Sequence, residues 1–156
     1  MDGRVKVKDD AMRVTADGPL GANSVNQACA VPFRSQQGSI QFCLITSSAG
    51  RWLFPKGYVD PGDTCAETAL KEALEEAGLH GRIAGEPLGS YQIVKSGDKL
   101  TVIALLMEVA QTDEVWKEAL KRQRRWVSFE EARRLLSDSE LFVLLDKAKR
   151  LVGQDS

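Results

Sequence analysis

The most regular hydrophobic pattern of the chain lies between Thr64 and Gly78. Apolar residues recur there at intervals of three and one, which places them on a single stripe of a helix with 3.6 residues per turn; they are Ala66, Ala69, Leu70, Ala73, Leu74 and Ala77. Thr64 and Glu67 have the spacing of a capping box at a helix start. Gly78 stands where a left-handed C-terminal cap is expected. We therefore predict a helix from Thr64 to Gly78.

Shorter apolar runs on either side of this helix predict strands. They cover residues 25–33, 40–45, 51–54, 81–93, 100–109 and 124–127. Pro32 has no backbone N–H, so the first strand is expected to end there or to lie at a sheet edge. Turns are expected at residues 35–38 and 95–98, and Gly and Pro residues should interrupt the run 81–93. The run 100–109 is the most apolar and should form a central strand.

Two further helices are predicted near the C-terminus. Ser128 and Glu131 form a second capping-box pattern, which opens a helix that ends at Leu136. Residues 141–151 have the pattern of an amphipathic helix. Residues 113–120 are expected to form a short helical or irregular excursion. The order of strands and helices favours an α/β fold with a mixed sheet held between helices.

Three glutamates crowd the last turn of the first predicted helix. Glu72, Glu75 and Glu76 lie at helical spacings that bring their carboxylates together, and like charges at such spacings cost roughly 0.2–0.5 kcal/mol per pair. The negative end of the helix dipole opposes them further. Lys71 can offset only part of this charge. A hard divalent cation such as Mg²⁺ would make the arrangement favourable, because carboxylate and carbonyl oxygens are its ligands.

The segment Gly57–Leu79 resembles the Nudix box, G-x5-E-x7-R-E-U-x-E-E-x-G-U, in which U is a bulky aliphatic residue. The matching positions are Gly57, Glu72, Glu75, Glu76, Gly78 and Leu79, whereas Asp63, Lys71 and Ala73 depart from the pattern. The resemblance implies the Nudix α/β/α sandwich and the hydrolysis of phosphoanhydrides. It also implies Mg²⁺, or Mn²⁺, held by the Gly57 carbonyl, Glu72, Glu76 and Glu75, with Glu75 or Glu72 as the base and Lys71 in the place of the arginine.

Motifs outside the box resemble the diphosphoinositol polyphosphate and diadenosine polyphosphate branch of that family. They are R-W-x-x-P-K-G at 51–57 and K-R-x-R-R-W-V-S-x-E-E-A at 121–132. In that branch, basic residues in such positions hold highly phosphorylated ligands. The corresponding substrate-binding candidates in this chain are Arg34, Arg51, Lys56, Arg122 and Arg124, with Lys95 and Lys99 as weaker candidates. Alternation along a strand would place Arg124 and Trp126 on one face and Arg125 on the other.

The length and net charge of the chain limit the number of domains and the kinds of partner that we expect. The 156 residues have the size of one domain, expected over residues 24–151 after a flexible arm at 1–23. A net charge of −1 gives no general attraction for nucleic acid or membranes. No apolar run reaches the ~18 residues of a membrane span, and the N-terminus has no apolar core for a signal peptide. We expect a cytoplasmic monomer or homodimer whose partner is a small phosphoanhydride.

The cysteines and the single histidine are not expected to be catalytic or metal-binding residues. Cys29, Cys43 and Cys65 lie in apolar patterns and are expected to be buried residues of a reducing compartment. His80 is expected to be a polar residue in the turn after Gly78. Two alternatives stay open: a pyrophosphatase of nucleoside triphosphates or ADP-ribose, and a ligand-binding or interaction module in which the three departures mark a degenerate box.

Overall fold

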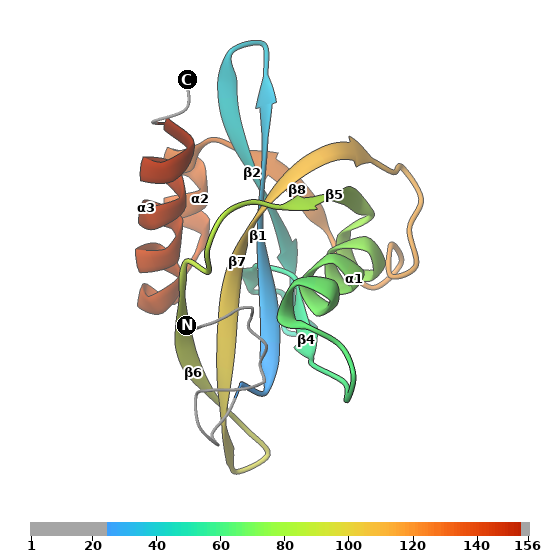
Figure 1. Ribbon diagram of the computed structural model, residues 1–156. Helices are drawn as coiled ribbons and strands as arrows, with labels where there is room; N and C mark the ends of the chain where they lie inside the picture. The colour runs from blue at the N-terminus through green and yellow to red at the C-terminus, as the bar shows by residue number, and fades with distance from the viewer. Residues whose placement is uncertain (1–24, 154–156) are drawn as a thin grey trace.

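The computed structural model describes residues 25–153, in which an eight-stranded mixed sheet lies between helices (Figure 1). The strands are β1 (Gln27–Gln36), β2 (Ser39–Thr46), β3 (Trp52–Leu53), β4 (Lys56–Tyr58), β5 (Leu79–Ile83), β6 (Gly89–Lys95), β7 (Asp98–Thr112) and β8 (Arg124–Val127). The helices are α1 (Cys65–Ala77), α2 (Phe129–Leu135) and α3 (Ser139–Gly153). The predicted α/β class with a mixed sheet between helices is confirmed. The arm predicted at residues 1–23 lies outside the described residues.

Strand β1 lies at the centre of the sheet, and the expectation that it ends at Pro32 or lies at an edge is wrong. It pairs in parallel with β7 along one side. Along its other side it pairs first with β4, through Gln27–Cys29, and then with β2 from Phe33 onward. Pro32 lies between these two antiparallel ladders, where one neighbour ends and the next begins. The strand therefore continues through the proline without losing a ladder hydrogen bond.

Helix α1 begins and ends as the sequence predicts. Thr64 accepts a hydrogen bond from the backbone N–H of Glu67, whose side chain accepts one in return, and Gly78 caps the other end with φ of 69°. The stripe facing the sheet contains small residues, with Ala69, Ala73 and Ala77 fully buried. Leu74 is 41% exposed and lies outside the buried part of the stripe. Short side chains let α1 approach the sheet closely.

The opposite face of the sheet is covered by α2 and α3 (Figure 1). Its core uses large side chains such as Phe42, Leu44, Leu144 and Leu145. Because successive residues of a strand point to opposite faces, β1 contributes Cys29 and Val31 here and Ala28 and Ala30 to the α1 face. The two cores are therefore separate layers built from the same strands.

Several local predictions are refined by the structure. The run 81–93 divides into β5 and β6, and β7 is longer than the predicted central strand. His80 lies within β5 and not in a turn, with Nε2 2.7 Å from Asp113 Oδ2. Ser128 caps α2 by accepting from the N–H of Glu131, but the Glu131 carboxylate lies against Arg125 and Arg134. Residues 113–120 had been expected to be either helical or irregular, and they are irregular.

The three cysteines are buried, as predicted. Burial raises the pKa of the Cys29 thiol and of the Cys43 thiol to about 12. Neither forms a reactive thiolate near neutral pH. None of the helices within residues 25–153 is long and apolar enough to cross a membrane.

Candidate active site

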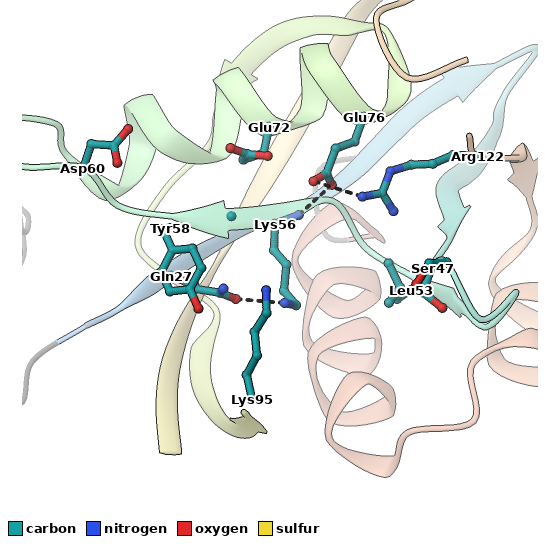
Figure 2. Close-up of a pocket in the computed structure, with 12 residues that line it drawn as sticks. Gln27, Ser47, Leu53, Lys56, Tyr58, Asp60, Glu72, Glu76, Lys95 and Arg122 are labelled. Carbon is teal, nitrogen blue, oxygen red and sulfur yellow. Dashed lines mark hydrogen bonds and ion pairs between the residues drawn. The ribbon is translucent and has the colours of Figure 1, made fainter. Parts of the chain in front are cut away.

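A cavity of about 500 Å³ opens beside the C-terminal half of α1 and extends past β4 (Figure 2). Most of the residues that line it are acidic, basic or polar; the lining consists of Gln27, Ser47, Ser48, Leu53, Lys56, Gly57, Tyr58, Asp60, Glu72, Glu76, Lys95 and Arg122. In Figure 2 the two glutamates of α1 lie on one side of β4, and the side chains of Lys56 and Lys95 lie on the other. The volume is within the range of small-molecule sites.

Glu72 and Glu76 form the acidic wall of this cavity. Glu76 is only 7% exposed, and its Oε1 accepts a hydrogen bond of 3.1 Å from the backbone N–H of Lys56. Glu72 lies one helical turn before Glu76, and both side chains line the cavity. Burial raises the pKa of Glu76 to about 8; the neighbouring Glu72 adds to this rise, and Arg122 opposes it. Burial also raises the pKa of Glu72.

Gly57 is required at its position by the approach of Glu72. A Cβ built on Gly57 would overlap the Glu72 carboxyl group and would lie 2.8 Å from its Cγ. Any larger residue would therefore displace Glu72 from β4. The glycine and the glutamate, separated in the sequence by fourteen positions of loop and helix, form one close contact in the cavity wall.

The C-terminal end of α1 is held by the segment 113–124, which joins β7 to β8. The carbonyl groups of residues 75–78 each accept a hydrogen bond from this segment; the donors are, in that order, the backbone N of Glu118 (3.1 Å), Nε1 of Trp116 (2.9 Å), Nη1 of Arg124 (2.8 Å) and the backbone N of Asp113 (2.8 Å). Carbonyls at a helix C-terminus have no partners within the helix. The segment therefore fixes the turn that carries Glu75 and Glu76.

Arg122 brings a guanidinium to the buried carboxylate. One of its terminal nitrogens, Nη2, is 3.4 Å from Glu76 Oε2. Its Nε donates to Glu118 at 2.7 Å, and its Nη1 donates to the carbonyl of Thr46 at 2.8 Å. This residue ties the segment 113–124 to the end of β2 and lines the cavity with the same side chain.

The opposite wall is cationic. Lys56 Nζ donates a hydrogen bond of 2.8 Å to Oε1 of Gln27, which is itself 1% exposed. Lys95 lies with its Nζ 5.2 Å from the centre of the Tyr58 ring. Burial, and next the charge of Lys95, lowers the pKa of Lys56. Within residues 25–153, no carboxylate lies at ion-pair distance from either ammonium group, so this end of the cavity favours an anion.

The structure places the other candidates of the box outside the cavity lining. Glu75 is partly exposed beside Lys117, at 3.9 Å between Oε2 and Nζ. Lys71 is paired with Asp60 at 3.3 Å and with Asp63 at 3.9 Å, and the hydrogen bond to Asp60 raises its pKa.

Three of the five arginine and lysine candidates for substrate binding also lie outside the lining. Arg34 donates to Gln41 and stacks on Trp126 at 4.0 Å. Arg124 caps α1 and stacks on Trp116 at 4.0 Å. Arg51 is exposed in the loop before β3. Lys56 and Arg122 do line the cavity, and of the weaker pair Lys95 does so and Lys99 does not.

The acidic wall fits a magnesium ion. No group of three or more His, Cys, Asp or Glu side chains among residues 25–153 forms a complete ligand set. Mg²⁺ usually takes only one or two carboxylates from the protein and completes its shell with water and phosphate oxygens. Glu72 and Glu76 lie one helical turn apart on α1 and both line the cavity, so they supply the one or two carboxylates that such an ion requires.

Six lining residues were not among the sequence candidates: Gln27, Ser47, Ser48, Leu53, Tyr58 and Asp60. Gln27 stands in an apolar run of β1, and a polar residue within such a run is the signal that could have identified it. By alternation with Cys29 and Val31 it lies on the α2/α3 face of the sheet. Tyr58 directly follows Gly57, and its ring is half exposed at the cavity. Both depend on strand pairing that the sequence does not specify.

The fold and this cavity define an α/β protein with a box of acidic residues on α1 facing a cationic wall. Residues 25–146 match the family model described as the NUDIX domain. The chain belongs to the Nudix family.

Individual relatives agree with this assignment. The chain is 41% identical over 99 residues to Nudix hydrolase 4 of Arabidopsis thaliana, a match covering 60% of this chain and 46% of that protein. It is 31% identical over 126 residues to the asymmetrical bis(5'-nucleosyl)-tetraphosphatase of Mus musculus, covering 76% and 85%. The crystal structure of a C. elegans Ap4A hydrolase binary complex is similar with a TM-score of 0.71 and 26% identity, covering 83% and 98%.

The plant relatives are longer proteins. The chain spans 46%, 58% and 61% of three Arabidopsis Nudix hydrolases. Two of these are named chloroplastic and mitochondrial, and the cytoplasmic location of this chain stays a prediction.

Proposed function

We propose that this chain is a Mg²⁺-dependent hydrolase of a phosphoanhydride bond in a nucleoside- or inositol-linked polyphosphate, with Mn²⁺ as an alternative ion. The observation that carries the proposal is the division of one cavity into two walls. Glu72 and Glu76 supply oxygen ligands on one side of β4, and Lys56 and Lys95 supply ammonium groups on the other (Figure 2). A substrate that contains several linked phosphates can reach both walls at once.

The residues of the acidic wall would hold the ion and the attacking water. When bound, the ion would neutralise phosphate charge and make water acidic enough to attack near neutral pH. Glu76 is fixed by the Lys56 N–H and by Arg122, so it supplies a positioned oxygen. We assign proton removal to Glu72, because its carboxyl group lines the cavity whereas Glu75 lies beside Lys117. Glu75 would act through its charge on the same turn.

The cationic residues would orient the phosphate chain and stabilise its leaving group. Lys56 is held by Gln27, which fixes the direction of its ammonium group. Lys95 projects from the β6–β7 hairpin into the same end of the cavity. Charge developing on the departing phosphate is stabilised most by groups already held in place, because they need no reorganisation during the reaction.

Among the candidate substrates we rank diadenosine polyphosphates first and diphosphoinositol polyphosphates second. The named activity of the mouse relative is that of a bis(5'-nucleosyl)-tetraphosphatase, and the match covers most of both proteins. A cationic wall beyond β4, in addition to the acidic wall, is of use to a chain of three or more phosphates and of little use to a single diphosphate. Tyr58 offers a flat ring beside Lys95, against which a nucleobase could stack.

Chromatographic analysis of products tests this proposal directly. Diadenosine tetraphosphate, a diphosphoinositol phosphate, a nucleoside triphosphate and ADP-ribose are incubated separately with the protein, once with Mg²⁺ and once with EDTA. We expect hydrolysis that requires the ion and is fastest with diadenosine tetraphosphate. If the triphosphate or ADP-ribose is hydrolysed fastest, the diadenosine polyphosphate assignment is wrong and that compound is the preferred substrate. Ligand-induced thermal stabilisation without hydrolysis of any of the four would identify a binding module with a degenerate box.

A further inference from the structure

The three nitrogens of the Arg122 side chain have different kinds of partner. Nε donates to Glu118 at 2.7 Å and Nη1 donates to the Thr46 carbonyl at 2.8 Å. Nη2 is 3.4 Å from Glu76 Oε2, the longest of the three separations. Glu118 and Thr46 belong to the scaffold around the cavity, whereas Glu76 belongs to the acidic wall. The guanidinium therefore has two short scaffold contacts and one longer contact with the acidic wall.

A cation at the acidic wall would compete with this third contact. Glu76 Oε1 is already occupied by the Lys56 N–H at 3.1 Å, which leaves Oε2 as the oxygen that either Arg122 or a dication can use. A guanidinium beside that oxygen also repels a dication directly. Within the described residues, Arg122 is thus the internal counterion of the carboxylate that the proposed reaction needs for its metal.

We propose that Arg122 changes partners when the metal binds: the metal takes Glu76 Oε2 from Nη2, and Nη2 then donates to a phosphate oxygen of the substrate. This inference rests on the proposed function for the identity of the ligand. Glu118 and the Thr46 carbonyl keep their contacts with Nε and Nη1 and so hold the guanidinium at the cavity. The planar fork of arginine allows this division, because its nitrogens point in fixed and different directions.

The exchange gives Arg122 two effects of opposite sign. Arg122 weakens binding of the metal alone, because it occupies Oε2 of Glu76 and its positive charge repels the ion. Arg122 strengthens binding of the phosphate once the metal is present, because Nη2 can then donate a charge-assisted hydrogen bond to a phosphate oxygen. A residue that only ties the segment 113–124 to β2 would lack this signature, because its loss would loosen the site and weaken both ligands together.

Isothermal titration calorimetry of R122Q with two probes tests the inference. The first probe is Mg²⁺ alone, and the second is methylenediphosphonate, which is not hydrolysed, at saturating Mg²⁺. We expect the Kd of Mg²⁺ to fall on the order of tenfold, since a unit charge a few ångströms away acts through a partly screened medium. We expect the Kd of the diphosphonate to rise by about the same factor, the effect of losing one charge-assisted hydrogen bond.

The matched control is R125Q. Arg125 lies three residues further along the chain, on β8, and its Nη2 is 3.4 Å from Glu131 Oε2, away from the cavity. Both affinities should stay at the wild-type values in this variant. If R122Q does not fold, R122K decides, because a lysine keeps a positive charge but lacks the three-way fork. It should also bind Mg²⁺ more tightly, by a smaller factor, and the diphosphonate more weakly.

Two results would overturn the inference. One is a Kd of Mg²⁺ that stays the same or rises in the Arg122 variant. The other is an unchanged affinity for the diphosphonate. Failure of the proposed function is a separate result, because it appears as absence of hydrolysis in the wild-type protein while both calorimetric shifts can still be measured.

Discussion

The two faces of the sheet are packed by side chains of different size. Against α1, five of the eleven buried core residues are alanines, and three of these five lie on the helix itself. Against α2 and α3, only three of the eighteen are alanines, and large residues such as Phe42 and Leu145 predominate. Small residues bury little apolar area each, so they contribute little stability, but they let the helix axis lie close to the strands. This closeness brings the Glu76 carboxylate to the Lys56 N–H and the Glu72 carboxylate to Gly57.

This difference in side-chain size suggests that the two faces of the sheet have different roles. The α2/α3 face supplies most of the apolar burial that stabilises the domain, and the α1 face sets the positions of the carboxylates. Substitutions on the two faces should therefore separate stability from activity. The variants below test this division.

The largest effect on activity is expected for Glu76→Gln. The variant keeps the shape of the side chain but loses the negative charge at the acidic wall. We expect turnover to fall by about 10²–10³-fold, the range typical of removing one charge-stabilising group in an active site. The thermal midpoint measured in EDTA should stay near the wild-type value, because Gln removes a buried ionisable group. Turnover near the wild-type rate would contradict the placement of the metal on this wall.

On the other face, Leu145→Ala should reduce stability and leave the site intact. Leu145 is fully buried in the α2/α3 core, and truncation of such a leucine costs roughly 2–5 kcal/mol. Urea unfolding measures the loss. The turnover number at a temperature well below the new midpoint should match the wild-type value. A large loss of turnover there would mean that the α2/α3 face also positions the carboxylates.

The division between the faces is tested most directly by one substitution made on each. Ala73 of α1 and Ala148 of α3 are both fully buried against the sheet. Leucine at either position overpacks its core at a cost of roughly 1–3 kcal/mol. We expect Ala73→Leu alone to lower turnover, by up to about 10²-fold, because it moves α1 and misplaces reacting groups by about 1 Å. Equal losses of turnover in Ala73→Leu and Ala148→Leu would refute the division.

Local patterns were sufficient to predict α1, its caps and the position of the acidic cluster. The period of the apolar residues identifies the buried stripe, and Thr64, Glu67 and Gly78 supply the end groups themselves. The same pattern could not tell which glutamate faces the cavity. Glu76 borders the stripe and is buried, while Glu75, one position earlier, turns to Lys117.

The rest of the site comes from contacts between distant segments. Sequence reasoning offered Lys71, in part, and a bound cation to offset the charge at the end of α1. The structure adds the segment 113–124, which donates to four carbonyls there and brings Arg122 to Glu76. The motif at 121–132 indicated Arg122 and Arg124 as phosphate-binding candidates, but the segment has no periodicity, so its contacts with α1 could not be predicted. The expected alternation on β8 did hold, since Arg124 points to α1 and Arg125 to Glu131 of α2.

The cationic wall should affect substrate binding more than the stability of either face. Lys95 and Lys99 both belong to the β6–β7 hairpin, but only Lys95 lines the cavity among the described residues. We expect Lys95→Gln to raise the KM for diadenosine tetraphosphate by about tenfold, the loss of roughly one charge-assisted contact, and to leave the KM for a short diphosphate substrate nearly unchanged. Lys99→Gln should change neither value. Steady-state kinetics over substrates of increasing phosphate number measure the contrast. If both lysine variants weaken all substrates equally, the hairpin acts through its general positive field, and the cavity does not use separate walls for the metal and the far phosphates.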